Sequence, residues 1–359
     1  MKKTSFVAGV IILFLLISGI LAASEPTQYL AFFEASANYS KAIREKKSPQ
    51  EILTLKKKML AEAEKYIKKY EDKVPKNTVA VLGSLVLAYY QDKNINKVIY
   101  YGEKLAKKSG LNDLQKASLF LYMADSYITS NKDLNRGLEY ADGVILLAKN
   151  NIATSAGALK RKWQVLLSQA LYMKANVSFI KKDYDNALKY YEEAYSNYPS
   201  IRTLKKIRDI GKLYFVKKNY RKALNAFEYA YDKMKAKKSK KVYDCLKLMA
   251  KSYAKLGMGE KALATYKKLY SMRKNAEIAY KIGVEYNKKF KASGGKDKTF
   301  LEKAKQYWAE AVVLKSPKIY AAQAEKVLKN YMINMEKASL QDYEDLLKVA
   351  KKRLGLLNP

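Results

Sequence analysis

Apolar residues recur at helical spacing almost without interruption from Glu25 onward, in segments of about 15 to 25 residues that short polar turns separate. Only 6 Pro and 15 Gly occur in the 359 residues, a composition that favours long helices over strands. The pattern predicts an all-α chain of about sixteen helices in eight antiparallel pairs. The predicted pairs are 26–46 with 48–72, 77–91 with 94–108, 113–130 with 133–149, 156–181 with 183–197, 201–217 with 219–236, 239–256 with 258–273, 275–290 with 298–315, and 317–336 with 339–353.

An internal repeat is the strongest signal in the chain. Residues 181–188, Lys-Lys-Asp-Tyr-Asp-Asn-Ala-Leu, recur 36 residues later at 217–224 as Lys-Lys-Asn-Tyr-Arg-Lys-Ala-Leu. Small and aromatic residues flank each copy at matching positions, and two further units continue the pattern. These positions are Ala175, Ala187, Tyr191 and Ala194; Gly211, Tyr214, Ala223, Phe227 and Ala230; Ala250, Tyr253, Ala262 and Tyr266; and Gly283, Tyr286, Ala304, Trp308 and Ala311.

This pattern resembles the tetratricopeptide (TPR) repeat, in which a small residue and a tyrosine on a first helix precede alanine, an aromatic residue and alanine on a second. The resemblance implies a right-handed superhelical solenoid, because each pair buries its apolar face only against neighbouring pairs. It covers residues 155–317. Residues 25–154 keep only degenerate helical repeats, and residues 318–359 are expected to form C-terminal capping helices.

Residues 1–24 have the three parts of a secretory signal peptide. Lys2 and Lys3 supply the positive start, residues 6–23 form an apolar run, and Ala22 and Ala23 suit a cleavage site. The alternative is an uncleaved N-terminal anchor, since 18 apolar residues lie at the lower limit for a membrane-spanning helix. Both alternatives predict export to the periplasm, the cell exterior or the cell envelope, with membrane contact only through this segment if it is uncleaved.

The chain is strongly basic, with 70 Lys and Arg against 34 Asp and Glu and a formal charge of +36. Such a charge attracts acidic partners, while the alternative is a lysine coat that only solvates exposed helix faces. Because export separates the body from the nucleic acids of the cell, the sequence disfavours a nucleic-acid partner.

The sequence predicts no enzyme, cofactor or metal site. Histidine is absent, and Cys245 is the single cysteine, which we expect to be a buried, unreactive thiol. Four Ser-x-x-Lys pairs occur, about as many as chance gives, and Gly294-Gly295-Lys296 lacks the spacing of a phosphate-binding loop. No nucleophile therefore has a recognisable base partner.

The TPR resemblance implies a concave groove, lined by the first helix of each pair, that receives a protein or peptide. The carboxylate clamp known from this family is not carried over, because only Asn176 fits its pattern. Aligning the repeats instead places a row of basic and aromatic residues on the exposed faces of successive first helices, and this row is the predicted groove. Its residues are Tyr172, Asn176, Phe179, Arg208, Lys212, Phe215, Lys247, Lys251, Tyr280 and Asn287.

Two functions are compatible with these features. The first is a non-catalytic protein- or peptide-binding scaffold of the bacterial cell envelope, whose partner segment is acidic. The second is a binder of acidic envelope polymer or lipid, which uses the basic and aromatic surface. The sequence leaves the oligomeric state open.

Expression of the full chain in a secreting bacterial host should yield a mature N-terminus at Ser24 or Glu25, because signal peptidase cleaves after small residues. N-terminal sequencing of the purified protein measures this directly. An intact segment from Met1 to Ala23 on membrane-bound protein would establish the uncleaved anchor instead.

Overall fold

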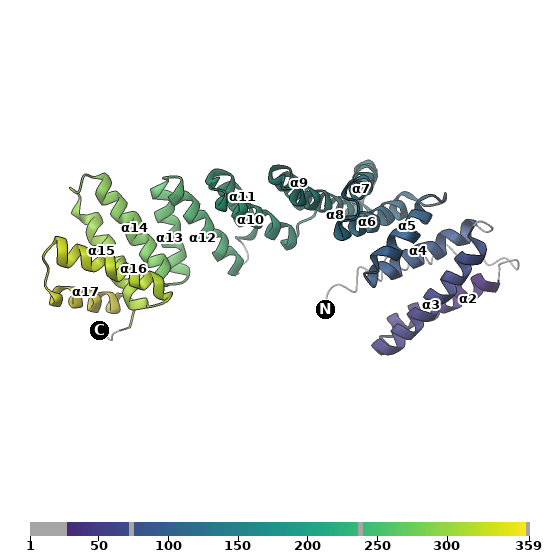
Figure 1. Ribbon diagram of the computed structural model, residues 1–359, viewed down its shortest axis with the longest axis horizontal. Helices are drawn as coiled ribbons and strands as arrows, with labels where there is room; N and C mark the ends of the chain where they lie inside the picture. The colour runs from purple at the N-terminus through teal and green to yellow at the C-terminus, as the bar shows by residue number, and fades with distance from the viewer. Residues whose placement is uncertain (1–26, 72–74, 236–239, 357–359) are drawn as a thin grey trace. The chain divides into compact units, whose positions relative to one another are not determined.

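The computed structural model describes residues 27–71, 75–235 and 240–356, which form sixteen α-helices and one π-helical segment (Figure 1). No strand occurs in these ranges. The helices are α2 (Thr27–Arg44), α3 (Pro49–Tyr70), α4 (Pro75–Gln91), α5 (Ile95–Ala106), α6 (Asp113–Ser130), α7 (Leu134–Thr154), α8 (Gly157–Ile180), α9 (Tyr184–Asn197), α10 (Ile201–Val216), α11 (Tyr220–Met234), α12 (Lys240–Lys255), α13 (Gly259–Met272), α14 (Ala276–Ala292), α15 (Lys298–Leu314), α16 (Lys318–Lys329), η1 (Asn330–Met335) and α17 (Leu340–Arg353).

The all-α fold predicted from the sequence is confirmed, and most helix ends fall within a few residues of the predicted ones. The signal-peptide or anchor prediction for residues 1–24 lies outside the described residues. Within the described ranges, no helix combines the length and apolar character needed to cross a membrane.

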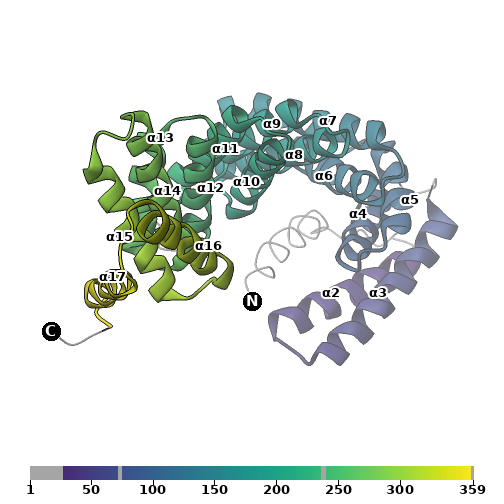
Figure 2. The ribbon, with the colours of Figure 1, turned by 60° about the vertical axis from the view of Figure 1, so that its left-hand side comes forward.

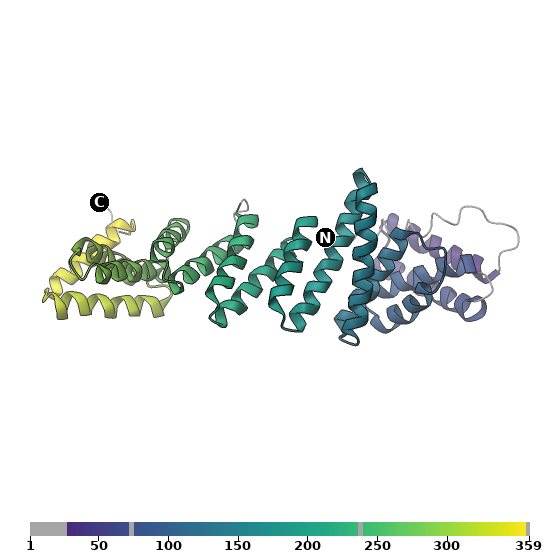
Figure 3. The same cartoon turned by 90° about the horizontal axis from the view of Figure 1, so that it is seen from above.

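The chain divides into two compact units, one ending at Thr203 and the other beginning at Leu204. In the first unit α2 packs on α3, α4 on α5, α6 on α7 and α8 on α9. In the second unit α12 packs on α13 and α14 on α15, and α13 also contacts α14. Within each unit, helices that follow one another in sequence lie side by side when viewed from above (Figure 3). Each unit is therefore a stack of sequential helix pairs.

The same tight turn joins the two helices in several pairs. A lysine in the left-handed region closes the turn, and the next residue, Asn or Asp, caps the second helix by accepting a hydrogen bond from the N–H three residues on. The turn residues are Lys93 (φ 58°) with Asn94, Lys182 (φ 62°) with Asp183, and Lys218 (φ 61°) with Asn219. The repeated octapeptide found in the sequence encodes this turn and the start of the second helix.

Small residues set the distance between paired helices. Gly211 on α10 lies so close to α11 that a Cβ there would be 2.6 Å from Cε1 of Phe227. Gly283 on α14 is similarly close to α15, with a Cβ position 2.5 Å from Cδ1 of Trp308. Phe227 and Trp308 are almost fully buried, so each aromatic ring fills the space that the glycine leaves.

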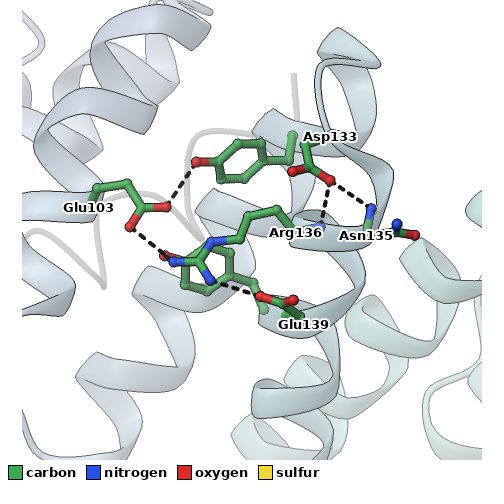
Figure 4. Close-up of polar contacts among 7 residues, drawn as sticks. Glu103, Asp133, Asn135, Arg136 and Glu139 are labelled. Carbon is green, nitrogen blue, oxygen red and sulfur yellow. Dashed lines mark hydrogen bonds and ion pairs between the residues drawn. The ribbon is translucent and has the colours of Figure 1, made fainter.

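Consecutive helix pairs are joined by polar contacts as well as by apolar contacts. Glu103 on α5 accepts a hydrogen bond from the Tyr127 hydroxyl on α6 at 2.8 Å and pairs with Arg136 on α7 at 3.3 Å (Figure 4). Although burial raises the pKa of the Glu103 carboxyl, hydrogen bonds from its tyrosine and arginine neighbours outweigh burial and lower it. The carboxylate is thus held ionised at the junction between two repeats.

The C-terminal end departs from the predicted last pair. The predicted helix 317–336 is α-helical to Lys329 and continues as the π-helical η1. Helix α17 packs mainly on α15, and α16 packs on α14 and α15 (Figure 2). Lys329 at the end of α16 lies over the Tyr343 ring of α17, 5.4 Å from its centroid. Both final helices therefore cover α15.

Cys245 on α12 is completely buried, as expected from its place in an amphipathic helix. Burial raises the pKa of its thiol to about 11, so little thiolate forms near neutral pH.

The Gly283→Ala substitution should lower the free energy of unfolding by about 1–3 kcal/mol, because the added methyl group collides with the buried Trp308 ring. Helix propensity alone predicts the opposite, an increase of about 1 kcal/mol in the free energy of unfolding. Urea unfolding followed by circular dichroism measures the difference. Gly259→Ala is the matched control, since its Cβ would have no neighbour nearer than 3.7 Å. A Gly283→Ala protein as stable as the wild type would contradict the close-packing account.

Candidate functional site

The predicted groove residues of α8 are engaged in packing within the first unit. Tyr172 is only 9% exposed, whereas the sequence placed it on an exposed face. Its ring meets Tyr191 edge-on at 5.2 Å, and the Arg202 guanidinium lies 4.6 Å from its centroid. Asn176 accepts a hydrogen bond from the Tyr191 hydroxyl at 2.6 Å. The expectation of exposure was wrong for Tyr172, because the α9 tyrosine and the start of α10 cover it.

Phe179 and Phe215 lie just before the tight turns of their pairs. Phe179 packs edge-on against Tyr184 at 5.6 Å, and Phe215 packs edge-on against Tyr220 at 5.2 Å. Both phenylalanines are half-buried. Each therefore forms an aromatic pair with the first residue of the following helix.

Arg208 and Lys212 on α10 share one acidic neighbour, Asp209, at 3.3 and 3.5 Å. The Arg208 side chain is 14% exposed, and its buried Nε has no hydrogen-bond partner among the described residues. On the neighbouring α12, burial together with Lys205 and Arg208 lowers the pKa of the Lys241 ammonium. This part of the second unit is therefore crowded with positive charge.

Lys247 and Lys251 on α12 converge on a single carboxylate, Glu277 of α14. Lys251 lies 3.0 Å from Glu277, and Lys247 donates a short hydrogen bond to its other oxygen. Glu277 is 6% exposed. Burial raises the pKa of the Glu277 carboxyl, but the hydrogen bonds from Lys247 and Lys251 outweigh burial and leave it below its ordinary value of 4.5.

Lys281, one turn beyond Glu277, lies between two tyrosine rings. Its ammonium is 5.6 Å from the Tyr280 centroid and 5.8 Å from the Tyr320 centroid. No ion pair joins Lys281 to a carboxylate among the described residues. Burial, followed by the charge of Lys251, lowers the pKa of Lys281. We name Lys247, Lys251, Glu277, Tyr280, Lys281 and Tyr320 the α12–α14 cluster.

The cluster contains three lysines and one carboxylate, a formal excess of two positive charges beside two aromatic rings. It unites three of the predicted groove residues, Lys247, Lys251 and Tyr280. A fourth, Asn287, instead accepts a hydrogen bond from the Tyr331 hydroxyl of η1 at 2.8 Å. Sequence reasoning missed Glu277, Lys281 and Tyr320. Lys281 directly follows a predicted groove tyrosine, which is the one signal that pointed to it.

No group of three or more potential metal-binding side chains comes together in the ranges that the structure describes. The ammonium groups of the cluster attract anions, and its two tyrosine rings offer apolar contact area.

No protein-family model and no curated protein matches the chain. Solved structures with a similar arrangement of helices include a tetratricopeptide repeat protein from Parabacteroides merdae ATCC 43184, at 14% identity over 84% of this chain and 100% of that chain, with a TM-score of 0.40. The apo form of RapI is 14% identical over 98% of this chain and 94% of that one, with a TM-score of 0.49. A Rap protein complexed with competence and sporulation factor is 11% identical over 99% and 97%, with a TM-score of 0.39.

At these identities and TM-scores the similarity identifies no function for this chain. The chain's own geometry defines it as an all-α helical-repeat protein with TPR-like helix pairs, in which the repeat positions quoted from the sequence are buried.

Glu277→Gln should lower the free energy of unfolding at pH 7 by about 2 kcal/mol, because two lysines lose an ionised partner. A carboxyl with a lowered folded-state pKa stabilises the fold above its unfolded pKa, and this contribution disappears as pH falls through the folded pKa. The difference between wild type and variant should therefore shrink below pH 4.5.

Urea unfolding at pH 7 and at pH 3 measures this dependence. Glu260→Gln is the matched control, since the Glu260 side chain is 75% exposed and its pair with Lys289 should contribute less than about 1 kcal/mol. An equal decrease in the free energy of unfolding for both variants, or a decrease for Glu277→Gln that does not change with pH, would contradict this account.

Proposed function

We propose that the chain is a non-catalytic scaffold of the bacterial cell envelope that binds an acidic protein or peptide segment through the α12–α14 cluster. The observation that carries this proposal is Lys281, a half-buried ammonium flanked by two tyrosines that forms no ion pair among the described residues, with Glu277 as its nearest charge partner beyond ion-pair distance. A partner carboxylate placed beside Lys281 would supply a direct ion-pair partner, and Tyr280 and Tyr320 would contact its apolar stem.

The arrangement of Glu277 supports the same proposal. Glu277 fixes the Lys247 and Lys251 side chains, so less side-chain entropy is lost when a partner binds beside them. It also cancels only part of their charge. The cluster is therefore preorganised and still attracts anions.

The envelope location rests on residues 1–24 alone, whose charge and hydropathy pattern supports export. A scaffold there would meet proteins and acidic polymers rather than nucleic acid.

The second function, binding of acidic polymer or lipid, is favoured by a different observation. Lysines lie over tyrosine rings at many places besides the cluster, for example Lys69 over Tyr70 and Lys268 over Tyr231. Such pairs spread over both units would bind a repeating polyanion without using one particular site.

Lys281→Gln should weaken binding of an acidic peptide about tenfold, the loss expected for one charge-assisted hydrogen bond. The probe is a fluorescent twelve-residue peptide that alternates Glu with Ala and Leu, and fluorescence anisotropy at 0.15 M salt measures its affinity. A peptide with Gln in place of Glu should bind weakly to both proteins.

Lys261→Gln is the matched control, because Lys261 also lies over a tyrosine ring, that of Tyr253, and its loss changes the net charge equally. This variant should bind the acidic peptide within about twofold of the wild type. Equal weakening in both variants would show that net charge decides binding, which favours the polymer-binding function and contradicts the cluster.

A further inference from the structure

A pocket in the second unit lies where the helix turn between α12 and α13 meets the C-terminal half of α14. Its volume is about 510 Å³, within the range of small-ligand sites. Residues that line it include Ala254, Gly259, Glu285, Lys289 and Phe300. None of them belongs to the α12–α14 cluster.

The pocket arises from a departure in the repeat pattern. The α12–α13 turn has the same backbone as its counterparts: Gly257 takes the left-handed conformation (φ 72°), and the Met258 N–H donates to the Tyr253 carbonyl at 2.9 Å. The equivalent hydrogen bonds in the two turns that precede it along the chain, Asp183 to Ser178 and Asn219 to Tyr214, are also 2.9 Å long. The three turns therefore align residue by residue.

The turn between α12 and α13 lacks an aromatic pair that the two preceding turns possess. Phe179 and Tyr184 form an edge-on aromatic pair across the first turn, and Phe215 and Tyr220 form the same pair across the second. The corresponding residues of the third turn are Ala254 and Gly259. Two aromatic rings are thus replaced by one methyl group and a hydrogen atom, and both residues line the pocket.

A buried carboxylate faces the space that these rings would occupy. Glu285 is 3% exposed, and its Oε1 accepts a hydrogen bond from Lys288 at 2.8 Å. Its Oε2 lies 3.7 Å from the position of a Cβ on Gly259 and has no donor among the described residues. This oxygen is not one of the fully buried unpaired side-chain atoms, so it can accept a hydrogen bond from a group that enters the pocket.

Elsewhere in the chain, several carboxylates accept a hydrogen bond from a tyrosine hydroxyl. Tyr127 donates to Glu103 at 2.8 Å, and Tyr270 donates to Glu310 at 2.6 Å. The remaining pocket wall also suits an aromatic ring, because Phe300 lies there with the Lys289 ammonium 4.8 Å from its centroid.

We infer that this pocket is a binding site for a phenol-bearing group, such as a tyrosine side chain of a partner, whose ring replaces the missing aromatic pair and whose hydroxyl donates to Glu285. The site goes beyond the proposed acidic-segment binding and does not depend on it.

Binding of p-cresol, the side-chain analogue of tyrosine, tests the site in the full-length protein by ligand-detected NMR titration. We expect p-cresol to bind at millimolar concentration and toluene, which lacks the hydroxyl, to bind about tenfold more weakly. Glu285→Gln should weaken p-cresol binding severalfold and leave toluene binding unchanged.

Gly259→Tyr introduces the residue found in the two preceding turns, Tyr184 and Tyr220, and should abolish binding of both probes. Its backbone is helical, so the substitution should fold normally, which circular dichroism and the thermal midpoint check. Lys261→Tyr, on the exposed face of the same helix, is the matched control and should bind p-cresol as the wild type does.

The inference is overturned if p-cresol does not bind, or if Gly259→Tyr binds it as well as the wild type does. Equal affinities for p-cresol and toluene, with no effect of Glu285→Gln, would also overturn it, since the pocket would then be merely apolar. Tighter binding of n-butylammonium than of p-cresol would show a cation site and would likewise exclude the phenol. If Gly259→Tyr fails to fold, the Glu285→Gln comparison decides alone.

Discussion

The close approach of two antiparallel helices at a small residue is the constraint on which each repeat depends. Gly211 and Gly283 have no room for a Cβ, because Phe227 and Trp308 fill the space against them. The alanines at equivalent positions, such as Ala175 and Ala250, are completely buried. A helix pair joined in this way presents apolar surface on both sides and must stack on further pairs to bury it. The interior of each unit is therefore a series of similar aromatic and alanine contacts.

The chain has about half as many acidic as basic residues, 34 against 70. Some of the carboxylates interact with more than one neighbouring side chain. Glu103 joins two repeats through a tyrosine and an arginine, and Glu277 gathers two lysines of the preceding pair. Buried or half-buried carboxylates in these positions stay ionised because hydrogen bonds offset their desolvation. Because lysines outnumber carboxylates, an ammonium such as Lys281 forms no direct ion pair among the described residues. In our proposal, this excess of positive charge gives the second unit its affinity for anions.

The α12–α14 cluster and the pocket beside α13 arise from the same repeat architecture in opposite ways. The cluster is formed by side chains from the first helices of successive pairs, because stacking of the pairs brings Lys251 of α12 next to Glu277 of α14. In the pocket, one repeat lacks the aromatic pair that the two preceding repeats possess, so an open pocket forms beside a regular backbone. A repeat protein can thus acquire sites by side-chain substitution alone, while the helix pairing that stabilises it is unchanged.

The sequence by itself determined the helices, their order and their pairing. These depend on local properties: apolar spacing, the Asn or Asp cap that follows a left-handed turn residue, and the small and aromatic positions of the repeat. The burial of Cys245 followed for the same reason, since one face of an amphipathic helix must be covered. Where the pattern weakened, at the C-terminal end, the sequence predicted a simple last pair and missed both η1 and the packing of α17 on α15.

Only the tertiary structure decided what the candidate site residues touch. Periodicity put Tyr172 on an exposed face, yet Tyr191 and Arg202 cover it. Lys251 and Glu277 are 26 residues apart, and no local rule shows that they meet. Ala254 and Gly259 are visible in the sequence as departures from the repeat, but their meaning depends on Glu285, which reaches the space they leave from another helix pair. Helix formation follows from residues within a few turns of one another, whereas charge pairing and cavities follow from contacts between segments distant in sequence, which exist only once the chain has packed.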